Sequence, residues 1–457
     1  MSQSFDVIVV GARCAGSTLA TLLAREGLRV GVVERATFPR DTLSSHLFQA
    51  PGINVLGRLG VLDRVRDTGA SCIREIDFRQ DQFAKRTSHS MRPGDAGGFM
   101  SVRRFHLDPI LADAAAAAGA EVMMATNVVG LVGDGRVSGV RVTSGGAERV
   151  LSTRLVVGAD GRNSTIAKLT RARKYHVVPS ERFAYWGFFE GVTNGSEPEV
   201  VYHHWDGRVV IACPSDGGLY QVIVAPAARF QPEFRGDLEG AFMDHARACM
   251  PVAQKLEGAR RVGKLFGIVR WESFFRESAG RGWVLVGDAG QFKDPTAGQG
   301  MADAFRQAAA LAPAIAGAIE SSDAGLDAAV AAWAGWRDRD AFEHHFLASD
   351  YGAAGNMPKV ISEMMGRLDR RGELSEVIDI FQHRATPSRV ITPPRLLAMV
   401  GAMMMRPGSN RREVVREVRE LVTTDIGRKR LRRQPVFVDP IAHADAGETE
   451  VPQEIAA

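Results

Sequence analysis

FDVIVVGARCAGSTLATLLAREGLRVGVVE, residues 5–34, is the stretch of sequence that decides the fold. Residues 5–10 form a short apolar run rich in β-branched side chains, which predicts a buried strand. Residues 14–26 are rich in alanine and leucine and predict a helix that Gly27 stops. Residues 29–34 predict a second buried strand. A strand, a helix and a strand in this order predict a parallel pair joined by a right-handed crossover.

The turn between the first strand and the helix reads GARCAG over residues 11–16, and Glu34 ends the second strand. Gly11 permits the tight turn, and Gly16 lets the helix pack closely against the strand. The helix N-terminus offers N–H groups and a positive dipole to a pyrophosphate, while Glu34 can accept hydrogen bonds from ribose hydroxyls. Arg13 replaces the middle glycine of a GxGxxG motif, and its Cβ limits close approach. The pattern indicates a dinucleotide-binding turn.

Two later segments repeat the pattern of an apolar strand followed by glycine and aspartate. GADGRNS, residues 158–164, follows the apolar run 155–157, although Asp-Gly turns are common and the motif is weak alone. GDA, residues 287–289, follows the run 283–286, and KDPTAGQG, residues 293–300, then opens a helix. The N-terminus of that helix would present N–H groups to an anion or to an electron-rich ring edge.

The rest of the chain divides into segments that differ in residue composition. A helix at 107–119 precedes strands with turns at 133–135 and 144–146. Aromatic and β-branched runs between 176 and 270 predict antiparallel strands of a separate sheet. After a helix at about 300–320, the chain from about 325 predicts helices only. Asn410 and Glu413 form a capping box there, before an apolar stripe of Val414, Val418, Leu421 and Val422.

Composition excludes several classes of protein. The 457 residues are 45% hydrophobic and 24% charged, as in globular proteins and unlike disordered or fibrous ones. A net charge of +4 is too small to imply a nucleic-acid partner. The four cysteines (Cys14, Cys72, Cys213 and Cys249) show neither metal-binding nor disulfide spacing, so no metal is expected. With no signal-peptide pattern and no apolar run of membrane-spanning length, we expect a reduced, cytoplasmic protein without stable membrane insertion.

The positive charge is concentrated near the C-terminus. Residues 406–433 hold ten basic and four acidic side chains, a local charge of +6 against +4 for the whole chain. We interpret this segment as the solvated face of a helix.

Together, in this order and spacing, the three glycine-containing motifs resemble those of FAD-dependent monooxygenases of the para-hydroxybenzoate hydroxylase type. That superfamily also contains flavin-dependent halogenases and geranylgeranyl reductases. The resemblance spans about residues 5–320. It implies an α/β fold (α+β overall) in which a Rossmann-like FAD-binding domain (1–75, 100–175 and 265–325) is interleaved with an antiparallel-sheet substrate domain (76–99 and 176–264). A helical C-terminal region (326–440) and a tail (441–457) complete the chain.

The resemblance also implies which residues bind FAD. Residues 11–16 would hold the pyrophosphate, Glu34 the adenosine ribose, Asp288 the ribityl or pyrophosphate part, and 298–301 the flavin ring. Residues 42–46 fall where a loop of the family reaches the isoalloxazine. The full set is Gly11, Ala12, Ala15, Gly16, Glu34, Arg35, Ser44, Ser45, Arg104, Asp160, Asp288, Gly298, Gln299, Gly300 and Met301.

The implied reaction uses NAD(P)H and O2, through a flavin C4a-(hydro)peroxide, to hydroxylate or epoxidise an aromatic or polycyclic small molecule. NAD(P)H would bind transiently, or a separate flavin reductase would supply reduced FAD. The flavin performs the difficult step, so no catalytic side chain is assigned. His46 is a candidate proton shuttle and Lys293 a second candidate, with pairing to Asp294 or Asp288 as its structural alternative. Candidate substrate contacts, each equally a candidate for ordinary sheet core, are Trp186, Phe188, His203 and Trp205.

Three alternatives remain open. A halogenase would carry a Trp-x-Trp-x-Ile-Pro motif, which is absent, and its essential lysine would have to be Lys85 or Lys293. A reductase of isoprenoid or enone double bonds would have an apolar tunnel and no dependence on O2. A non-enzymatic flavoprotein would use its helical C-terminus to dock a partner or a membrane. The enzyme would be a monomer or a homodimer.

Overall fold

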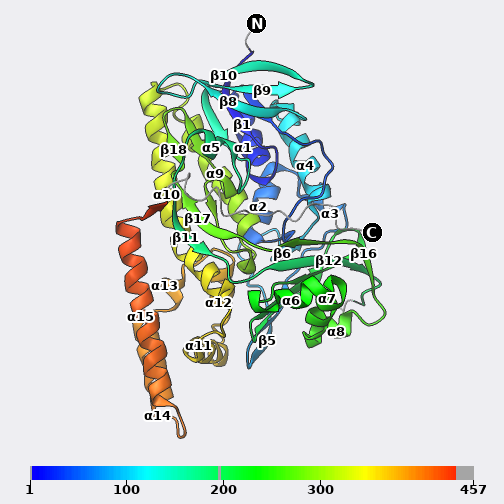
Figure 1. Ribbon diagram of the computed structural model, residues 1–457, viewed down its shortest axis with the longest axis vertical. Coiled ribbons are helices and arrows are strands. Elements are labelled where there is room, and N and C mark those ends of the chain that lie inside the picture. Colours follow the sequence, from blue (N-terminus) through cyan, green and yellow to red (C-terminus); the bar gives the residue numbers. More distant parts are fainter. Residues whose placement is uncertain (1–2, 194–196, 439–457) are drawn as a thin grey trace.

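The computed structural model describes residues 3–193 and 197–438 (Figure 1). The predicted tail, 441–457, lies outside these residues, as do positions 439 and 440 of the predicted helical region. The described chain forms two large sheets, the helices that pack on them and a C-terminal helical region.

The main sheet carries the predicted strand–helix–strand unit. β1 lies between β2 and β10 and is parallel to both, and β10 is parallel to β19. The strands of this sheet are β1 (Gln3–Val10), β2 (Val30–Val33), β7 (Glu121–Met123), β8 (Asn127–Val132), β9 (Gly139–Ser144), β10 (Ala147–Gly158), β18 (Ala279–Gly280) and β19 (Trp283–Leu285).

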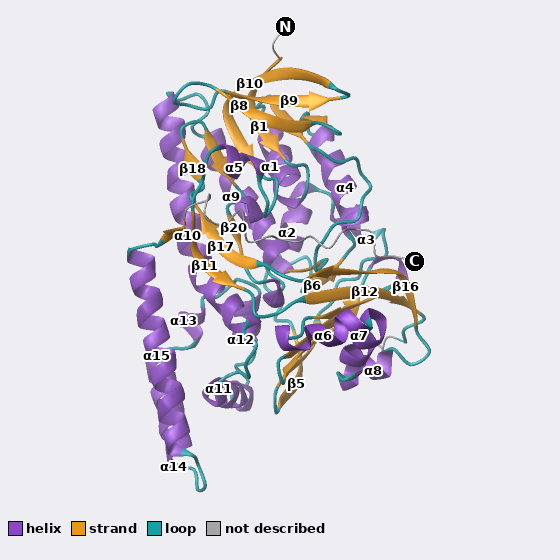
Figure 2. Ribbon diagram, viewed as in Figure 1, coloured by secondary structure: helices purple, strands orange, loops and turns teal. Residues whose placement is uncertain are grey.

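Both faces of the main sheet are buried, which explains why its strands are continuous apolar runs. Val7 and Val9 of β1 pack into one core cluster, and Phe5, Ile8 and Val10 pack into another on the opposite face. The first cluster is completed by helices that cover that face (Figure 2). The helices of this part of the chain are α1 (Cys14–Arg25), α2 (Ala50–Leu59), α3 (Leu62–Arg66), α4 (Arg104–Ala117), α5 (Thr165–Leu169) and α9 (Gly300–Ala316).

The second sheet joins two distant parts of the chain, as the interleaved fold predicts. Its strands are β4 (Glu75–Gln80), β5 (Phe83–Ser88), β12 (Ala184–Glu190), β13 (Glu199–Trp205), β14 (Arg208–Pro214), β15 (Tyr220–Val224) and β16 (Arg260–Ile268). Two details differ from the expectation. β4 runs parallel to β13, so the sheet is mixed, and β16 continues four residues past the proposed boundary at 264. One face is covered by unpredicted helices: α6 (Gln231–Gly236), α7 (Leu238–Arg247) and α8 (Met250–Lys255).

Two smaller sheets connect these parts. One contains β3 (Leu47–Gln49) and β6 (Phe99–Ser101), and the other β11 (Lys174–Pro179), β17 (Glu272–Arg276), β20 (Gln291–Phe292) and β21 (Phe437–Val438). Because β21 pairs with β11, the expectation of helices only after residue 325 is wrong at this point.

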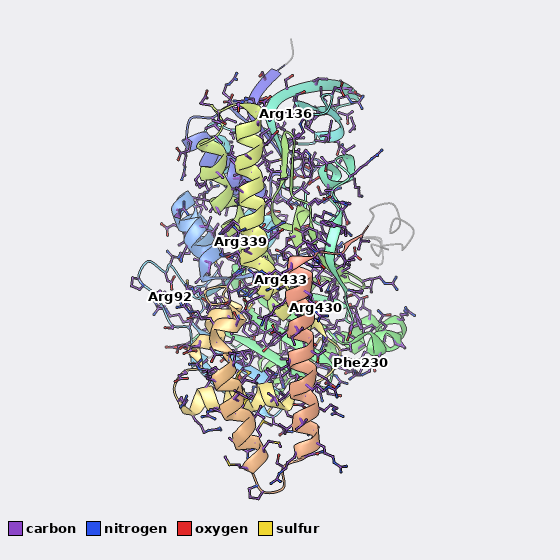
Figure 3. All side chains as sticks on the ribbon, turned by 90° about the vertical axis from the view of Figure 1, so that its left-hand side faces the viewer. Arg92, Arg136, Phe230, Arg339, Arg430 and Arg433 are labelled. Atoms are coloured by element: carbon purple, nitrogen blue, oxygen red, sulfur yellow. The ribbon has the colours of Figure 1, made fainter. Side chains whose placement is uncertain are left out.

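The C-terminal region begins with α10 (Asp323–Gly352), which runs along one side of the molecule (Figure 1). It continues with α11 (Lys359–Arg370), α12 (Ser375–Phe381), α13 (Pro387–Val390), α14 (Pro393–Met405) and α15 (Arg411–Arg433). α14 and α15 form a hairpin whose tip extends beyond the other elements in both views (Figures 1 and 3). The cap predicted at Asn410 is confirmed, since its side chain accepts a hydrogen bond from the Glu413 N–H at 3.3 Å.

None of the helices in 3–193 and 197–438 is both long and apolar enough to cross a bilayer. The four cysteines are free in the structure.

Candidate functional site

The three motifs meet at one edge of the main sheet. Val10 is paired with Val33 on one side and with Gly158 on the other, and Gly158 is paired with Leu285. The residues that follow these strand ends therefore lie in a row. Ligands of open parallel sheets bind outside the carboxyl ends of the strands, which is this edge.

The first turn is held by contacts that only glycine permits. Gly11 has φ = +104°, and a Cβ built on it would lie 2.5 Å from the Ala159 carbonyl oxygen. A Cβ on Gly16 would lie 1.8 Å from the Gly11 carbonyl oxygen. α1 therefore starts directly against β1 and β10. The N-cap residue of α1, Arg13, makes no side-chain capping bond, so the first-turn N–H groups face the turn without that acceptor.

Glu34 stands beside that turn and is 4% exposed. Its two carboxylate oxygens accept hydrogen bonds from the N–H groups of Ala12 and Ala36, each at 2.9 Å. Each oxygen retains a lone pair, so the carboxylate can accept further donors. Arg35, in contrast, is exposed.

Asp160 forms hydrogen bonds within its own turn. Its carboxylate accepts hydrogen bonds from the Ser164 hydroxyl at 2.5 Å and from the N–H groups of Thr165 and Ile166 at 2.6 and 3.2 Å. It therefore caps α5 and fixes the turn after β10. Because its carboxylate is occupied by these local bonds, we propose that it shapes this turn rather than binding the cofactor directly.

Asp288, in the 3₁₀ turn Gly287–Ala289, lies among cationic side chains. Burial raises the pKa of its carboxyl to about 6, against the lowering influence of Arg162 and Arg104. One guanidinium nitrogen of Arg162, Nη1, is buried without a hydrogen-bond partner among the described residues. Arg104 is itself buried and donates from Nε to Asp108 at 2.6 Å.

The loop before α9 is fixed by Asp294. Its carboxylate accepts hydrogen bonds from the Thr296 N–H at 3.0 Å and from the Trp271 indole at 2.9 Å. Gly298 then adopts φ = +65°, and its carbonyl accepts a hydrogen bond from the Gln49 amide at 2.8 Å. α9 begins immediately afterwards at Gly300, which is exposed, and Met301 is buried.

The sequence analysis offered Asp294 or Asp288 as a partner for Lys293. In the structure Lys293 instead pairs with Asp303 of α9 at 2.5 Å. It also donates to the Gln299 side-chain carbonyl at 3.1 Å. The lysine is 4% exposed. This buried ion pair holds the loop against α9, so the Lys293 ammonium is not free for chemistry.

Residues 44–46 lie near the starts of α9 and α4. The Ser44 hydroxyl contacts the Met301 sulfur at 3.3 Å, and the Ser45 hydroxyl donates to the Leu47 carbonyl. His46 is 2% exposed, and its Nδ1 accepts a hydrogen bond from the Arg104 N–H at 3.2 Å. Burial, with the nearby Arg104 and Arg103, lowers the pKa of His46 to about 3. A group with this pKa is poorly matched to proton transfer at neutral pH, so His46 fits a positioning role.

A partly enclosed cavity lies between this loop and the second sheet. It measures about 40 Å³, enough for roughly three water molecules. Its lining comprises Leu47, Gln49, Ile76, Phe78, Thr87, Phe99, Val200, Tyr202, Ile211, Ala297, Gly298, Leu374, Val377, Ile378 and Phe381. The last four belong to α12 or directly precede it, and they form one wall of the cavity.

The four aromatic residues expected at the substrate are divided between the faces of the second sheet. Trp186 and Phe188 pack in the same cluster as the cavity-lining Tyr202, although neither lines the cavity itself. Trp205 packs against the opposite cluster, toward α7, and His203 stacks on it with 4.0 Å between ring centroids. Side chains alternate along a strand, so His203 and Trp205 face away from the cavity.

The cavity wall supplied by α12 was missed in the sequence. Its apolar residues 374, 377, 378 and 381 have the i, i+3, i+4, i+7 spacing of a buried helix face, which was a usable signal. The spacing alone does not show what such a face packs against. In the structure, the Gln299 amide donates to the carbonyls of Ile380 and Phe381 at 3.2 and 2.9 Å, which ties α12 to the loop before α9.

Comparison with known proteins agrees with this geometry. Residues 4–333 match a family model described as an FAD binding domain. The chain belongs to this family of FAD-binding proteins. It is an FAD-dependent oxidoreductase of the para-hydroxybenzoate hydroxylase superfamily, which confirms the resemblance seen in the motifs.

Similar proteins of the FAD family differ in reaction. A digeranylgeranylglycerophospholipid reductase of Methanosarcina mazei is 27% identical over 342 residues, covering 71% of this chain and 78% of its own. A 6-methylpretetramide 4-monooxygenase of Streptomyces rimosus is 28% identical over 335 residues, covering 70% and 77%. The structure of the flavin-dependent brominase Bmp2 superposes with a TM-score of 0.72 at 19% identity, covering 88% of this chain and 98% of that one. This last likeness shows the shared fold.

The residues at the sheet edge fit FAD. The uncapped start of α1 suits a pyrophosphate, and Glu34 retains acceptors for ribose hydroxyls. The unpartnered Arg162 nitrogen and the charged Asp288 are polar groups that a bound ligand would satisfy. We therefore propose that the predicted set, apart from Asp160 and the exposed Arg35, contacts FAD directly. Gln299 would do so through its backbone, because its side chain is engaged by α12 and Lys293.

Asp288→Asn should stabilise the FAD-free protein at pH 7.5 by about 1–3 kcal/mol while weakening FAD binding. The folded-state pKa of about 6 lies above the ordinary 3.8, so the charged carboxyl disfavours the fold. This destabilisation is present above pH 6 and disappears as the pH falls through 6 toward 4. Urea unfolding of both proteins at pH 7.5 and 4.5 measures it. The exposed Asp134→Asn is the control, and a wild type more stable than D288N at pH 7.5 would contradict the prediction.

Proposed function

We propose that this oxidoreductase is an FAD-dependent monooxygenase that uses NAD(P)H and O2 to hydroxylate or epoxidise an apolar aromatic or polycyclic molecule. The observation that carries the proposal is the partly enclosed, apolar cavity between the loop before α9 and the second sheet. Bound FAD supplies the electron transfer and oxygen activation, and the chain supplies a dry site in which the substrate is oriented.

The cavity lining supports an apolar substrate. No acidic, basic or histidine side chain of the described residues lines it. Among the polar lining residues, the Tyr202 hydroxyl donates to the Thr296 carbonyl at 3.0 Å and the Gln49 amide to Gly298. The buried Gln49 Oε1 has no hydrogen-bond partner among the described residues and could accept one from a ligand, and Thr87 also lines the cavity. Recognition would combine this acceptor with shape and aromatic contact with Phe78 and Phe381, which stack or tilt against Tyr202.

The cavity of about 40 Å³ is smaller than any polycyclic molecule. α12 forms its outer wall and is a short helix, whereas the opposite wall is a sheet held by ladders of backbone hydrogen bonds. We infer that substrate enters by displacement of α12. Closure behind the substrate would then exclude water from the reaction.

Lysine placement argues against a halogenase. Lys85 pairs with Asp369 of α11 at 3.0 Å, and Lys293 is buried against Asp303. Neither lysine lines the cavity. A reductase of isoprenoid or enone double bonds is the second candidate, because the same apolar lining would accept a hydrocarbon chain.

Oxygen dependence separates the two candidates. A monooxygenase should oxidise NAD(P)H only in air and, without a substrate, should release hydrogen peroxide. The measurement follows NAD(P)H absorbance with and without O2, together with peroxide formation, across phenols, quinones and polyketides. If flavin reduced under argon is instead reoxidised by a prenylated quinone or an unsaturated isoprenoid, the reductase is correct and the monooxygenase proposal fails. The same panel with a purified flavin reductase added tests whether reduced FAD must be supplied.

A further inference from the structure

Exposed apolar side chains concentrate at the C-terminal end of the described chain. Of thirteen large hydrophobic residues that are exposed among the described residues, seven lie between 397 and 437. These seven are Leu397, Met405, Val415, Val422, Ile426, Val436 and Phe437. Met405 and Leu397, which are 78% and 72% exposed, belong to α14 in the projecting α14–α15 hairpin. Five of the seven lie on this hairpin, and such concentration on one projection is typical of an interaction surface.

The outward side of α15 combines these apolar residues with positive charge. We define its basic face as Arg411, Arg412, Val415, Arg416, Arg419, Val422, Thr423, Ile426, Lys429, Arg430 and Arg433, all of which are exposed. At 3.6 residues per turn these positions share one arc of about 140° on the helix. Arg430 and Arg433 are seen on the upper part of α15 in Figure 3.

No carboxylate of α15 lies within the basic face. Glu413 and Glu417 turn inward, where they bind the Lys359 ammonium at 2.9 Å and the Val360 N–H at 3.1 Å on α11. Glu420 and Asp425 lie at the margins of the arc. The inner side of the helix is thus anchored by its acidic residues. On the outer side Lys429 pairs with Asp425 at 2.6 Å, whereas Arg412, Arg416, Arg419, Arg430 and Arg433 have no ion pair among the described residues.

We propose that the basic face of α15 docks peripherally on an anionic lipid bilayer. A helix of 23 residues extends about 35 Å and can lie flat on a membrane. Its arginines would pair with anionic headgroups, while Val415, Val422 and Ile426 between them would reach the acyl boundary. A nucleic-acid backbone would use the charges but would leave these aliphatic side chains without a role. Docking of this kind requires no spanning helix.

The location of the basic face gives such docking a consequence for the cavity. α15 packs on α11 and α14, and the chain between these helices contains α12, the cavity wall. An enzyme held by α15 would therefore keep that wall near the lipid surface. The proposal itself does not depend on which flavin reaction the enzyme performs.

Vesicle sedimentation with the full-length, FAD-loaded protein tests the proposal. We expect binding to vesicles of equal phosphatidylcholine and phosphatidylglycerol, little binding to phosphatidylcholine alone, and loss of binding in about 0.5 M NaCl. Arg412→Glu/Arg416→Glu/Arg419→Glu should lower the partition coefficient about 100-fold or more. FAD absorbance of each variant reports that the flavin domain is folded.

A matched control reverses three exposed charges elsewhere, Lys168→Glu/Arg235→Glu/Arg247→Glu, and should bind vesicles like the wild type.

A second variant tests the contribution of the aliphatic side chains to vesicle binding. Val422→Ser/Ile426→Ser should lower partitioning about tenfold while leaving the salt dependence unchanged. Three results would overturn the proposal: equal binding to neutral and anionic vesicles, wild-type binding by the α15 triple variant, or binding to duplex DNA in a parallel titration without binding to anionic vesicles.

Discussion

Gly16→Ala is expected to raise the dissociation constant for FAD about 100-fold. The new Cβ would lie 1.8 Å from the Gly11 carbonyl oxygen and 3.2 Å from the Ala159 Cβ. Backbone cannot yield as a flexible side chain does, so the start of α1 must move away from β1 and β10. Overpacking of this kind costs about 1–3 kcal/mol, and the N–H groups that face the pyrophosphate move with the helix. Titration of the FAD-free protein with FAD, followed by quenching of flavin fluorescence, measures the change.

Gly57→Ala is the matched control, because a Cβ at Gly57 of α2 meets nothing within 4 Å. It should bind FAD like the wild type and be equally or more stable. Circular dichroism shows whether the G16A protein is folded before the titration. A folded G16A protein that binds FAD within twofold of the wild type would show that this contact does not shape the cofactor site.

The largest loss of stability is expected from Arg182→Met. Arg182 is 1% exposed and pairs with no carboxylate of the described residues, yet all three of its nitrogens donate. Its acceptors are the carbonyls of Gly207, Ala225, Gly352 and Ala353 and the His204 ring, at 2.6–3.0 Å. Methionine keeps much of the alkyl chain but leaves these buried acceptors without a donor. We expect the free energy of unfolding to fall by about 3–5 kcal/mol.

Urea unfolding followed by circular dichroism measures this loss. Arg235→Met, at an exposed position on α6 with a single side-chain hydrogen bond to Gln231, should change stability by less than about 0.5 kcal/mol. Equal unfolding midpoints for R182M and the wild type would mean that the second sheet and the end of α10 are held together without the guanidinium.

The meeting of the three motifs at one edge of the main sheet could be predicted from sequence, because it follows from short stretches of the chain. Each motif follows an apolar strand, and parallel strands bring their carboxyl ends to one edge. Glycines at 11 and 16, the acidic Glu34 and the Asp-containing turns at 160 and 288 therefore converge whatever the rest of the chain does. The burial of both sheet faces likewise follows from continuous apolar runs such as residues 5–10.

The residues that surround the cavity could not be predicted in the same way. Which face of β13 meets the cavity depends on strand register, and the alternation that turns Tyr202 inward turns His203 and Trp205 outward. The partner of Lys293 was missed because Asp303 lies ten residues away, on the far side of a loop whose left-handed turn at Gly298 brings α9 back. α12 reaches the cavity from a segment outside the family match, where no motif marks its destination.

The two hydrogen bonds from the Gln299 amide to Ile380 and Phe381 join the segment that matches the family model to the C-terminal helical region beyond it. Both acceptors are main-chain carbonyls, so the connection is indifferent to the side chains of α12. Those side chains can therefore change, and with them the molecule that the cavity admits, without loss of the hydrogen bonds to the loop before α9. The same arrangement offers protein engineers a way to reshape the cavity: the side chains of α12 that line it could be exchanged, provided that the helix still presents two carbonyls to Gln299.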